Sequence, residues 1–214
     1  MDVLNFVSWL KAGKYTTTAP IDAVTVIGVP NTTRGDAYLP ATVPISALQT
    51  NIGKLMGGGI VVSEWVENGV HKALVASLTT LSTSLSWTTS SYDTTLIGST
   101  AQSYSNGLTN TNAIIAQTGV PADTSYAVGI ARLYLGGGYN DWYLPAAWEL
   151  TMCYNAATVV NRILGTNGFL VDYYWSSTEV GATEAWTVYF SDGTFSLTTK
   201  NTGANVRAVR IHTF

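Results

Sequence analysis

The sequence predicts an α+β domain, in which two or three helices accompany an antiparallel sheet, preceded by an extended N-terminal arm. Two runs of strand-forming residues flank Asn68-Gly69, a dipeptide typical of tight hairpin turns. Pro145 precedes the clearest helical pattern of the chain, and proline is favoured at the start of helices. Short runs rich in β-branched and aromatic residues then follow from residue 173 onward, separated by turn residues. Helices beside such an antiparallel sheet make an α+β domain.

The first 56 residues are assigned to an attachment or oligomerisation arm. Val3, Phe6, Val7 and Leu10 have the spacing of one face of a short amphipathic helix, which Gly13 would end. So short a helix is marginal in water by itself. We therefore expect this apolar face to pack on the protein's own domain or on a neighbouring subunit. Residues 23–29 are predicted to form a strand, and residues 38–44 are predicted to be extended because prolines hold their neighbours out of the helical region.

Residues 57–214 are predicted to form one domain, which begins at a run of three glycines. Its opening hairpin has strands at 60–66 and 72–76. A Ser/Thr-rich surface loop at 79–91 carries Trp87, with a possible strand at 85–87. Helices are expected at 99–117, 125–135 and 146–164, and strands at 173–177, 185–190, 194–199 and 205–212.

Three short motifs follow one another along this second part of the chain. They are Asp141-Trp142-Tyr143-Leu144-Pro145, Tyr174-Trp175-Ser176-Ser177-Thr178-Glu179 and Val206-Arg207-Ala208-Val209-Arg210. Together they resemble the C-type-lectin-like module of bacterial lipoproteins, surface proteins and phage tail proteins, whose motifs are DWRLP, YWSST and VRxVR. Two departures are visible, since Tyr143 replaces the usual Arg and Ala208 stands where a Cys is often found.

The resemblance covers roughly residues 57–214 and has structural implications. It implies that the last strand returns beside the first hairpin, and that Trp142 and Trp175 fill the core. The first fifty residues are loosely similar to the N-terminal segment of certain phage virion proteins. This similarity implies a particle component whose partners are other virion proteins and further copies of itself, with a trimer weakly favoured.

The composition excludes several classes of function. Only 11% of the residues are charged, compared with about 25% in ordinary soluble domains. Surfaces rich in neutral hydroxyl and amide groups are common in extracellular and viral assembly proteins. The net charge is −3 and the ten basic residues are scattered, so no footprint for nucleic acid is present. The opening apolar residues are interrupted by Asn5, Ser8 and Lys11, which predicts neither a signal peptide nor a membrane span. We therefore expect a virion location without membrane insertion.

The residues that could carry catalysis do not form a recognisable motif. Cys153 is the only cysteine, which rules out an intramolecular disulfide and the paired-cysteine copper chemistry of formylglycine-generating enzymes, which share the resembling fold. We expect it on a buried helix face. His71 and His212 are the only histidines, and no local motif supplies them with a nucleophile and an orienting acid. The expectation is a protein that is not an enzyme.

No cofactor or metal is expected either. Calcium-dependent sugar binding in the resembling fold uses Glu-Pro-Asn or Gln-Pro-Asp with Trp-Asn-Asp, because calcium takes six to eight oxygen ligands. None of these tripeptides occurs in the sequence. The acidic residues that could supply calcium ligands in this part of the chain are far apart in the sequence. They are Asp141, Asp172, Glu179, Glu184 and Asp192.

The candidate ligand-binding residues lie between residues 179 and 205, because the resemblance implies that this stretch faces ligands. They are Glu179, Glu184, Trp186, Tyr189, Asn201 and Asn205. Trp186 and Tyr189 are three residues apart on one predicted strand, so they point to opposite faces and at least one points away from the core. Aromatic faces stack on sugar rings and also anchor protein interfaces.

These inferences favour a bacteriophage virion structural protein, either a tail-fibre or a capsid-decoration protein. It would display a C-type-lectin-like domain for adhesion to a host-surface glycan or protein. A purely structural decoration or connector protein without a ligand is the main alternative. A bacterial surface protein domain is the third, and the lack of a predicted signal peptide or lipobox cysteine weakens it.

The N-terminal arm yields the first prediction. Phe6→Asp together with Leu10→Asp places two carboxylates on the apolar face and should abolish oligomerisation or particle incorporation, while residues 57–214 remain folded. Light scattering and particle composition measure the first effect, and the thermal transition of the protein measures the second. Normal incorporation of the double variant would show that the first residues are not an anchor.

Overall fold

The computed structural model describes residues 23–26, 41–44, 50–118 and 122–214. The chain divides into two compact units, Met1–Thr50 and Asn51–Phe214. In the first unit, β1 (Ala23–Val26) pairs antiparallel with β2 (Ala41–Pro44). The predicted amphipathic face at residues 3–10 lies outside the described residues.

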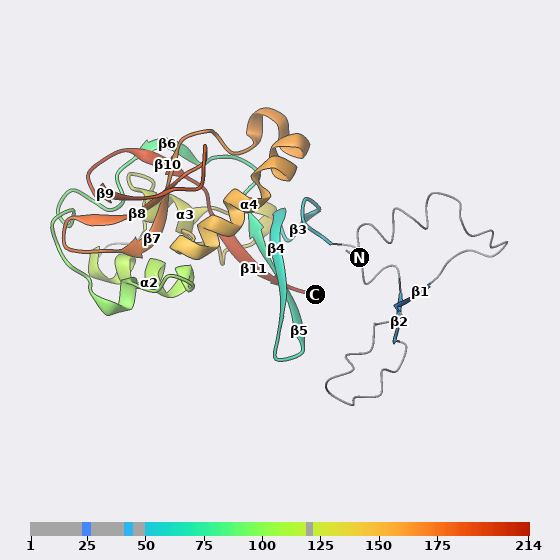
Figure 1. Cartoon of the computed structure of the whole chain (residues 1–214). Coiled ribbons are helices and arrows are strands. Elements are labelled where there is room, and N and C mark those ends of the chain that lie inside the picture. Colours follow the sequence, from blue (N-terminus) through green and yellow to red (C-terminus); the bar gives the residue numbers. More distant parts are fainter. Residues whose placement is uncertain (1–22, 27–40, 45–49, 119–121) are drawn as a thin grey trace, which may run out of the picture. The chain divides into compact units, whose positions relative to one another are not determined.

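The second unit contains two sheets (Figure 1). The five-stranded sheet has the order β6 (Ser82–Leu85), β10 (Ala204–Val206), β7 (Tyr173–Glu179), β8 (Glu184–Tyr189) and β9 (Phe195–Thr199). The four-stranded sheet has the order β11 (Val209–Thr213), β5 (Val70–Ala76), β4 (Gly59–Glu67) and β3 (Leu55–Met56). Neighbouring strands are antiparallel except β10 and β7, which are parallel.

Three α-helices accompany these sheets in the described part of the chain, so the α+β class is confirmed. They are α2 (Gly107–Thr118), α3 (Ala127–Leu133) and α4 (Ala147–Leu164). Short 3-10 turns occupy Ser99–Ala101, Gly136–Gly138 and Gly165–Asn167. The predicted helix at 99–117 is thus two elements, whereas the predicted helix after Pro145 agrees with α4 and ends at Gly165, whose φ of 58° favours glycine.

The opening hairpin turns as predicted. Asn68 and Gly69 have φ values of 51° and 77°, as a two-residue turn between twisted strands requires. The domain begins a few residues before the predicted start at residue 57, because β3 pairs with β4 and Asn51 binds the Glu64 carboxylate through its backbone N–H (3.0 Å) and Nδ2 (2.9 Å).

The last strand returns beside the first hairpin, and this expected closure is confirmed. In β11, Val209 lies opposite Ala76 of β5. The predicted strand at 205–212 is nevertheless divided into two, because the chain passes from the five-stranded to the four-stranded sheet at Arg207-Ala208. Beyond β11 the main chain of Tyr143 exchanges two hydrogen bonds of 2.9 Å with Val209. Strand β11 therefore lies at the end of its sheet and is covered by the DWYLP segment.

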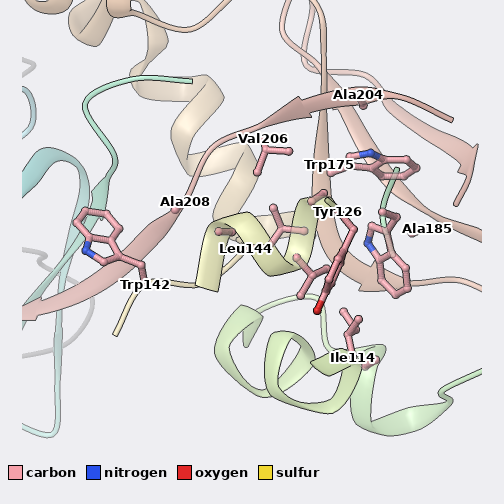
Figure 2. Close-up of a cluster of buried hydrophobic side chains, with 14 of the residues drawn as sticks. Ile114, Tyr126, Trp142, Leu144, Trp175, Ala185, Ala204, Val206 and Ala208 are labelled. Atoms are coloured by element: carbon pink, nitrogen blue, oxygen red, sulfur yellow. The ribbon is translucent and has the colours of Figure 1, made fainter. Parts of the chain in front are cut away.

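Two apolar clusters fill the domain, one on each face of the β4–β5 hairpin. The first contains Val61 and Val75 with residues of α2 and α3 and the three tryptophans Trp87, Trp142 and Trp175. Figure 2 shows part of this cluster, including Trp142 and Trp175. Both Trp142 and Trp175 fill the core as expected. Trp87 was expected on a surface loop, but it is fully buried and donates its Nε1–H to the Ser176 carbonyl at 2.8 Å.

The second cluster lies beneath α4, which contacts β4 of one sheet and β7 and β8 of the other. Leu150, Cys153 and Val160 form the buried side of the helix. Cys153 is thus a core residue, as predicted.

The Glu149 carboxylate near the start of α4 accepts hydrogen bonds from the Ala146 and Gly107 backbone N–H groups (2.8 and 3.1 Å) and from the Tyr143 hydroxyl (2.9 Å). Tyr143, which stands where the related motif has Arg, therefore fixes the beginning of the helix.

The two arginines of the last motif connect distant segments. Arg210 makes a two-point ion pair with Asp141 (2.6 and 2.8 Å), lies 3.8 Å over the Tyr139 ring and donates to the Gly57 carbonyl at 3.1 Å. This hydrogen-bonded arginine lowers the pKa of the Asp141 carboxyl. Arg207 is buried, donates to the Asn167 carbonyl at 3.0 Å and lies 4.5 Å from the centre of the Phe169 ring.

Truncation of the last strand should unfold the domain. Removing residues 207–214 takes away three buried residues. Val209 and Arg210 join the four-stranded sheet to the DWYLP segment, and Arg207 binds the Asn167 carbonyl. We expect the truncated protein to lack a cooperative thermal transition, measured by circular dichroism. Removal of only residues 213–214, which are exposed, is the control and should preserve the transition. Cooperative melting of the longer truncation would contradict this account of the closure.

Candidate ligand-binding surface

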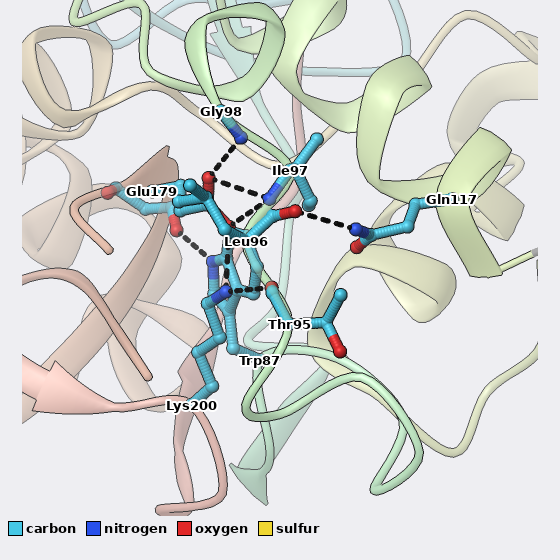
Figure 3. Close-up of polar contacts among 9 residues, drawn as sticks. Trp87, Thr95, Leu96, Ile97, Gly98, Gln117, Glu179 and Lys200 are labelled. Atoms are coloured by element: carbon cyan, nitrogen blue, oxygen red, sulfur yellow. Dashed lines mark hydrogen bonds and ion pairs between the residues drawn. The ribbon is translucent and has the colours of Figure 1, made fainter. Parts of the chain in front are cut away.

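A buried ion pair underlies the candidate surface. Lys200 Nζ lies 2.7 Å from Glu179 Oε1, and both side chains are fully buried (Figure 3). Lys200 also donates to the Thr95 carbonyl at 2.9 Å and lies 4.9 Å from the centre of the Trp87 ring. The Glu179 carboxylate accepts from the backbone N–H groups of Ile97 (2.9 Å) and Gly98 (2.7 Å). The pair therefore joins the ends of β7 and β9 to the loop before Ser99.

The six predicted site residues do not all reach the surface. Glu179 and Asn205 are buried, and Asn205 donates its Nδ2–H to the Tyr173 carbonyl at 2.8 Å. These two therefore shape the domain from inside, whereas a ligand-facing role was expected for them. Glu184, Trp186 and Tyr189 are half-buried and Asn201 is exposed. The accessible part of the predicted site is thus confined to β8 and the turn that follows β9.

Burial and polarity change along one face of the β8–β9 pair. Val188 lies opposite Phe195, Trp186 opposite Leu197, and Glu184 opposite Thr199, and directly opposed residues share a face. Val188 is buried in the cluster beneath α4. Leu197, in contrast, is 52% exposed opposite the half-buried Trp186. This face therefore passes from a covered apolar end, through an exposed aromatic middle, to a polar end.

Four aromatic rings gather at the exposed middle of this face, and we call them the aromatic shelf: Tyr104, Trp148, Trp186 and Phe195. Successive ring centres are 5.8 Å apart from Trp148 to Tyr104, 6.5 Å from Tyr104 to Trp186 and 6.0 Å from Trp186 to Phe195. Trp148 is 58% exposed, Tyr104 42% and Phe195 38%. The shelf thus brings together a loop, the first turn of α4 and two neighbouring strands.

Hydrogen bonds fix the shelf. The Trp186 Nε1–H donates to the Tyr104 hydroxyl at 3.0 Å, and the Trp148 backbone N–H donates to the Tyr104 carbonyl at 2.9 Å. The adjacent Ser103 carbonyl accepts from Thr178 Oγ1 of β7 at 2.9 Å. Tyr104 is therefore held by α4 and by two strands at once.

Tyr189 lies on the other face of β8, as the alternation predicted. Its ring stacks on Tyr173, with centres 4.5 Å apart and planes at 23°. Because Tyr189 lies directly opposite Tyr173 in the register, this stack belongs to the face away from Trp186. A ligand that contacts Trp186 on this sheet does not contact Tyr189 from the same side.

Tyr104 and Trp148 were missed because they lie far from the stretch at 179–205. A signal for Trp148 was present in the sequence. The buried side of α4 is formed by residues 150, 153, 156 and 160, and residue 148 falls on the opposite side of a helix with 3.6 residues per turn. A tryptophan outside the apolar side of a helix has no core to fill. For Tyr104, nothing in the local sequence separates it from other loop tyrosines.

The residue types that most often act in catalysis or bind metals, histidine and cysteine, lie apart from one another here and contact other parts of the fold. His71 lies 3.3 Å from a Glu64 oxygen and stacks on Phe214, with ring centres 4.1 Å apart. Burial raises the pKa of the Cys153 thiol to about 12, so the thiolate is scarce at neutral pH. Within residues 50–118 and 122–214, no three His, Cys, Asp or Glu side chains come together as metal ligands, and no helix has the length and apolarity to cross a membrane.

The buried ion pair should be sensitive to loss of one partner. Lys200→Met leaves the Glu179 charge buried without its cation, which we expect to lower the free energy of unfolding by about 3–5 kcal/mol. Adding Glu179→Gln removes that charge and should recover part of the loss. Denaturant unfolding measures both values.

The exposed pair of Lys72 and Glu67, 2.6 Å apart, offers a matched control. Lys72→Met should change stability by less than about 1 kcal/mol, because water screens charges at such positions. Equal losses from Lys72→Met and Lys200→Met would contradict a special role for the buried pair.

Comparisons with known proteins identify a family. The family described as the Lcl C-terminal domain matches residues 77–210. Among solved structures, a fimbrial protein from Bacteroides ovatus is similar, at 19% sequence identity and a TM-score of 0.42 over 66% of this chain, and the match spans 35% of that protein's length. None of the curated proteins matches the chain. Since the family match includes more than half of the sequence and all three motifs up to the final arginine, the protein belongs to the Lcl C-terminal domain family.

Proposed function

We propose that this protein is a non-enzymatic adhesion domain displayed on a bacteriophage particle, where it attaches the particle to the host surface. The observation that carries the proposal is the aromatic shelf, in which Tyr104, Trp148 and Phe195 remain substantially exposed although hydrogen bonds fix the cluster. Exposed aromatic side chains that cluster on a rigid base are characteristic of binding sites.

The C-type-lectin-like fold is part of this proposal. Its support is the position of the three motifs, which meet where the chain closes. Asp141 of the first motif binds Arg210 of the last, and Ser177 of the second donates its backbone N–H to the Pro145 carbonyl at 2.8 Å. The last strand also pairs with the first hairpin, as the resembling module requires.

The distribution of titratable groups supports binding rather than catalysis. Glu179 and Asp141 are held in ion pairs, and Glu149 is held by three hydrogen bonds at the start of α4. Catalysis by acid, base or nucleophile needs such groups within hydrogen-bond reach of one another and of a substrate. Here their partners are structural groups of the fold.

The virion location is supported by the low charge of the sequence and by the similarity of its first fifty residues to phage virion proteins. A second candidate is a domain of a bacterial surface protein, and membership of a family named for Lcl-type surface proteins favours it. Both candidates share the binding surface. They differ in the structure that carries the domain.

Mass spectrometry of fractionated cultures separates the two locations. In a lysate of a culture that carries the gene, we expect peptides of this protein in purified particles, at a constant ratio to the major capsid protein. Peptides confined to the cell envelope would favour the bacterial surface protein instead.

The adhesion is tested with the labelled full chain on cells of that culture. Trp186→Ala or Glu184→Ala should weaken cell binding at least tenfold, since buried anchors at interfaces contribute about 2 kcal/mol or more. The melting temperature should change little, and a chelator should have no effect. Val171→Ala, at a 69% exposed residue outside the shelf, is the control. Binding that survives both Trp186→Ala and Glu184→Ala, or that vanishes with the chelator, would leave the ligand-free decoration protein as the better account.

A further inference from the structure

We propose that strand β9 is an interface at which two copies of this chain pair edge to edge, so that their five-stranded sheets become one continuous sheet. The two-fold axis passes beside Ser196, and Phe195 of each copy lies opposite the partner's Leu197. The pairing uses main-chain groups at the edge of the sheet, and it goes beyond the proposed adhesive function without resting on it.

Of the four edge strands in the two sheets of the second unit, three have features that hinder pairing. Strand β11 is covered by Tyr143, whose main chain bonds that of Val209. Strand β3 is only two residues long, and the register of β6 with β10 is irregular. Covered edges, very short strands and irregular register are common devices against edge-to-edge association. The fourth edge strand, β9, shows none of them.

Strand β9 is regular and carries no charge. Its five residues, Phe-Ser-Leu-Thr-Thr, pair with β8 without a shift of register and include no proline or lysine. Within the described part of the chain, no strand or bridge pairs with its other side. A bare edge that is rich in strand-forming residues is a template on which another strand can pair.

The main-chain groups of β9 face β8 and the open edge in alternation. The Thr194 carbonyl accepts from the Tyr189 N–H, and the Lys200 N–H donates to the residue before β8, both at 2.9 Å. Even-numbered residues from 194 to 200 therefore face β8. In an antiparallel ladder the residues between them turn their N–H and C=O groups to the other side. Phe195 and Leu197 thus each present a donor and an acceptor at the open edge.

This open edge is complementary to itself, as a two-fold interface requires. With the axis beside Ser196, the Phe195 N–H donates to the carbonyl of the partner's Leu197, and the Phe195 carbonyl accepts from the N–H of that residue. The reciprocal pair satisfies the outward groups of Leu197 in the same way. Phe195 and Leu197 are 38% and 52% exposed, and directly opposed side chains share a face. Each therefore covers the other across the interface.

Charge also permits a second copy as the partner. The charged residue nearest to the start of β9 is Asp192, four residues from Ser196. In the antiparallel pair the two Asp192 carboxylates lie at opposite ends, about 27 Å apart at the rise of an extended chain. At the other end of β9, Lys200 is buried and paired with Glu179 of its own chain. Like charges therefore do not meet across the two β9 strands.

Disulfide cross-linking of the purified full chain tests both the pairing and its register. Ser196→Cys puts two thiols directly opposite each other at a position that is not hydrogen-bonded across the interface. The Cα atoms of such a pair are about 4.5 Å apart, which a disulfide can span. Cys153, the native cysteine, is buried and should not react. We expect a disulfide-linked dimer on non-reducing gels after mild oxidation with diamide.

Thr198→Cys is the matched control. Residue 198 lies on the same face of β9 as residue 196 and is half-buried like it. Because it is two residues from the axis, the two thiols would be about 13 Å apart along the strands. Thr198→Cys should therefore form the linked dimer at least tenfold more slowly than Ser196→Cys at the same protein concentration.

A second substitution tests whether the open edge itself makes the contact. Leu197→Lys adds a charge of the kind that protects edge strands, and should slow the linking of Ser196→Cys at least tenfold. Val171→Lys adds the same charge at a 69% exposed residue outside β9 and should leave the rate unchanged. Melting curves of all variants should coincide to within a few degrees. Equal rates for Ser196→Cys and Thr198→Cys, or a rate that Leu197→Lys does not lower, would overturn the inference.

Discussion

The surface that we assign to ligand binding depends on one interior interaction, the ion pair between Glu179 and Lys200. Removing two charges from water is costly, and the cost is offset only when each charge is fully hydrogen-bonded. Here the carboxylate receives two backbone N–H groups, and the ammonium binds a carbonyl and faces the Trp87 ring. The partners come from β7, the end of β9 and a loop about a hundred residues earlier in the chain. Glu184 and Thr199 lie between the two charged residues in the sequence and opposite each other in the β8–β9 pair, where they form the polar end of its exposed face.

The closure of the domain uses a different kind of interaction, which the two arginines of the final motif provide. Arg210 contacts Asp141, the Tyr139 ring and the Gly57 carbonyl, and thereby joins the beginning, the middle and the end of the domain. Arg207 is buried deeply enough that burial lowers the pKa of its guanidinium to about 10, and it remains charged at neutral pH. A planar guanidinium group suits the role of Arg210 because it donates to a carboxylate and to a carbonyl and still lies over an aromatic ring.

Local sequence patterns predicted correctly those features of the fold that depend mainly on neighbouring residues. The Asn68-Gly69 turn, helix α4 and the core positions of Trp142 and Trp175 follow from turn chemistry, periodicity and the motifs. The burial of Trp87 did not follow, because its Ser/Thr-rich neighbours are typical of a surface loop. Nor did the role of Glu179, whose cation is 21 residues away. Alternation along β8 showed that Trp186 and Tyr189 face opposite ways. No single segment, however, contains the information that Tyr104 contacts both Trp186 and Trp148.

The passage of the chain from β10 to β11 at Arg207-Ala208 has a consequence for biosynthesis. Both sheets receive a strand from residues 204–213, so neither can be completed until this segment has left the ribosome. Until then β5 has an unpaired edge, and a hairpin edge of that kind is a template for pairing with other chains. Ribosomes on one messenger RNA hold nascent chains of different lengths close together. The unpaired β5 edges of incomplete neighbouring chains can therefore pair with one another. Slow translation of the last segment would therefore lower the yield of folded protein through aggregation, without any change in the stability of the molecules that finish folding.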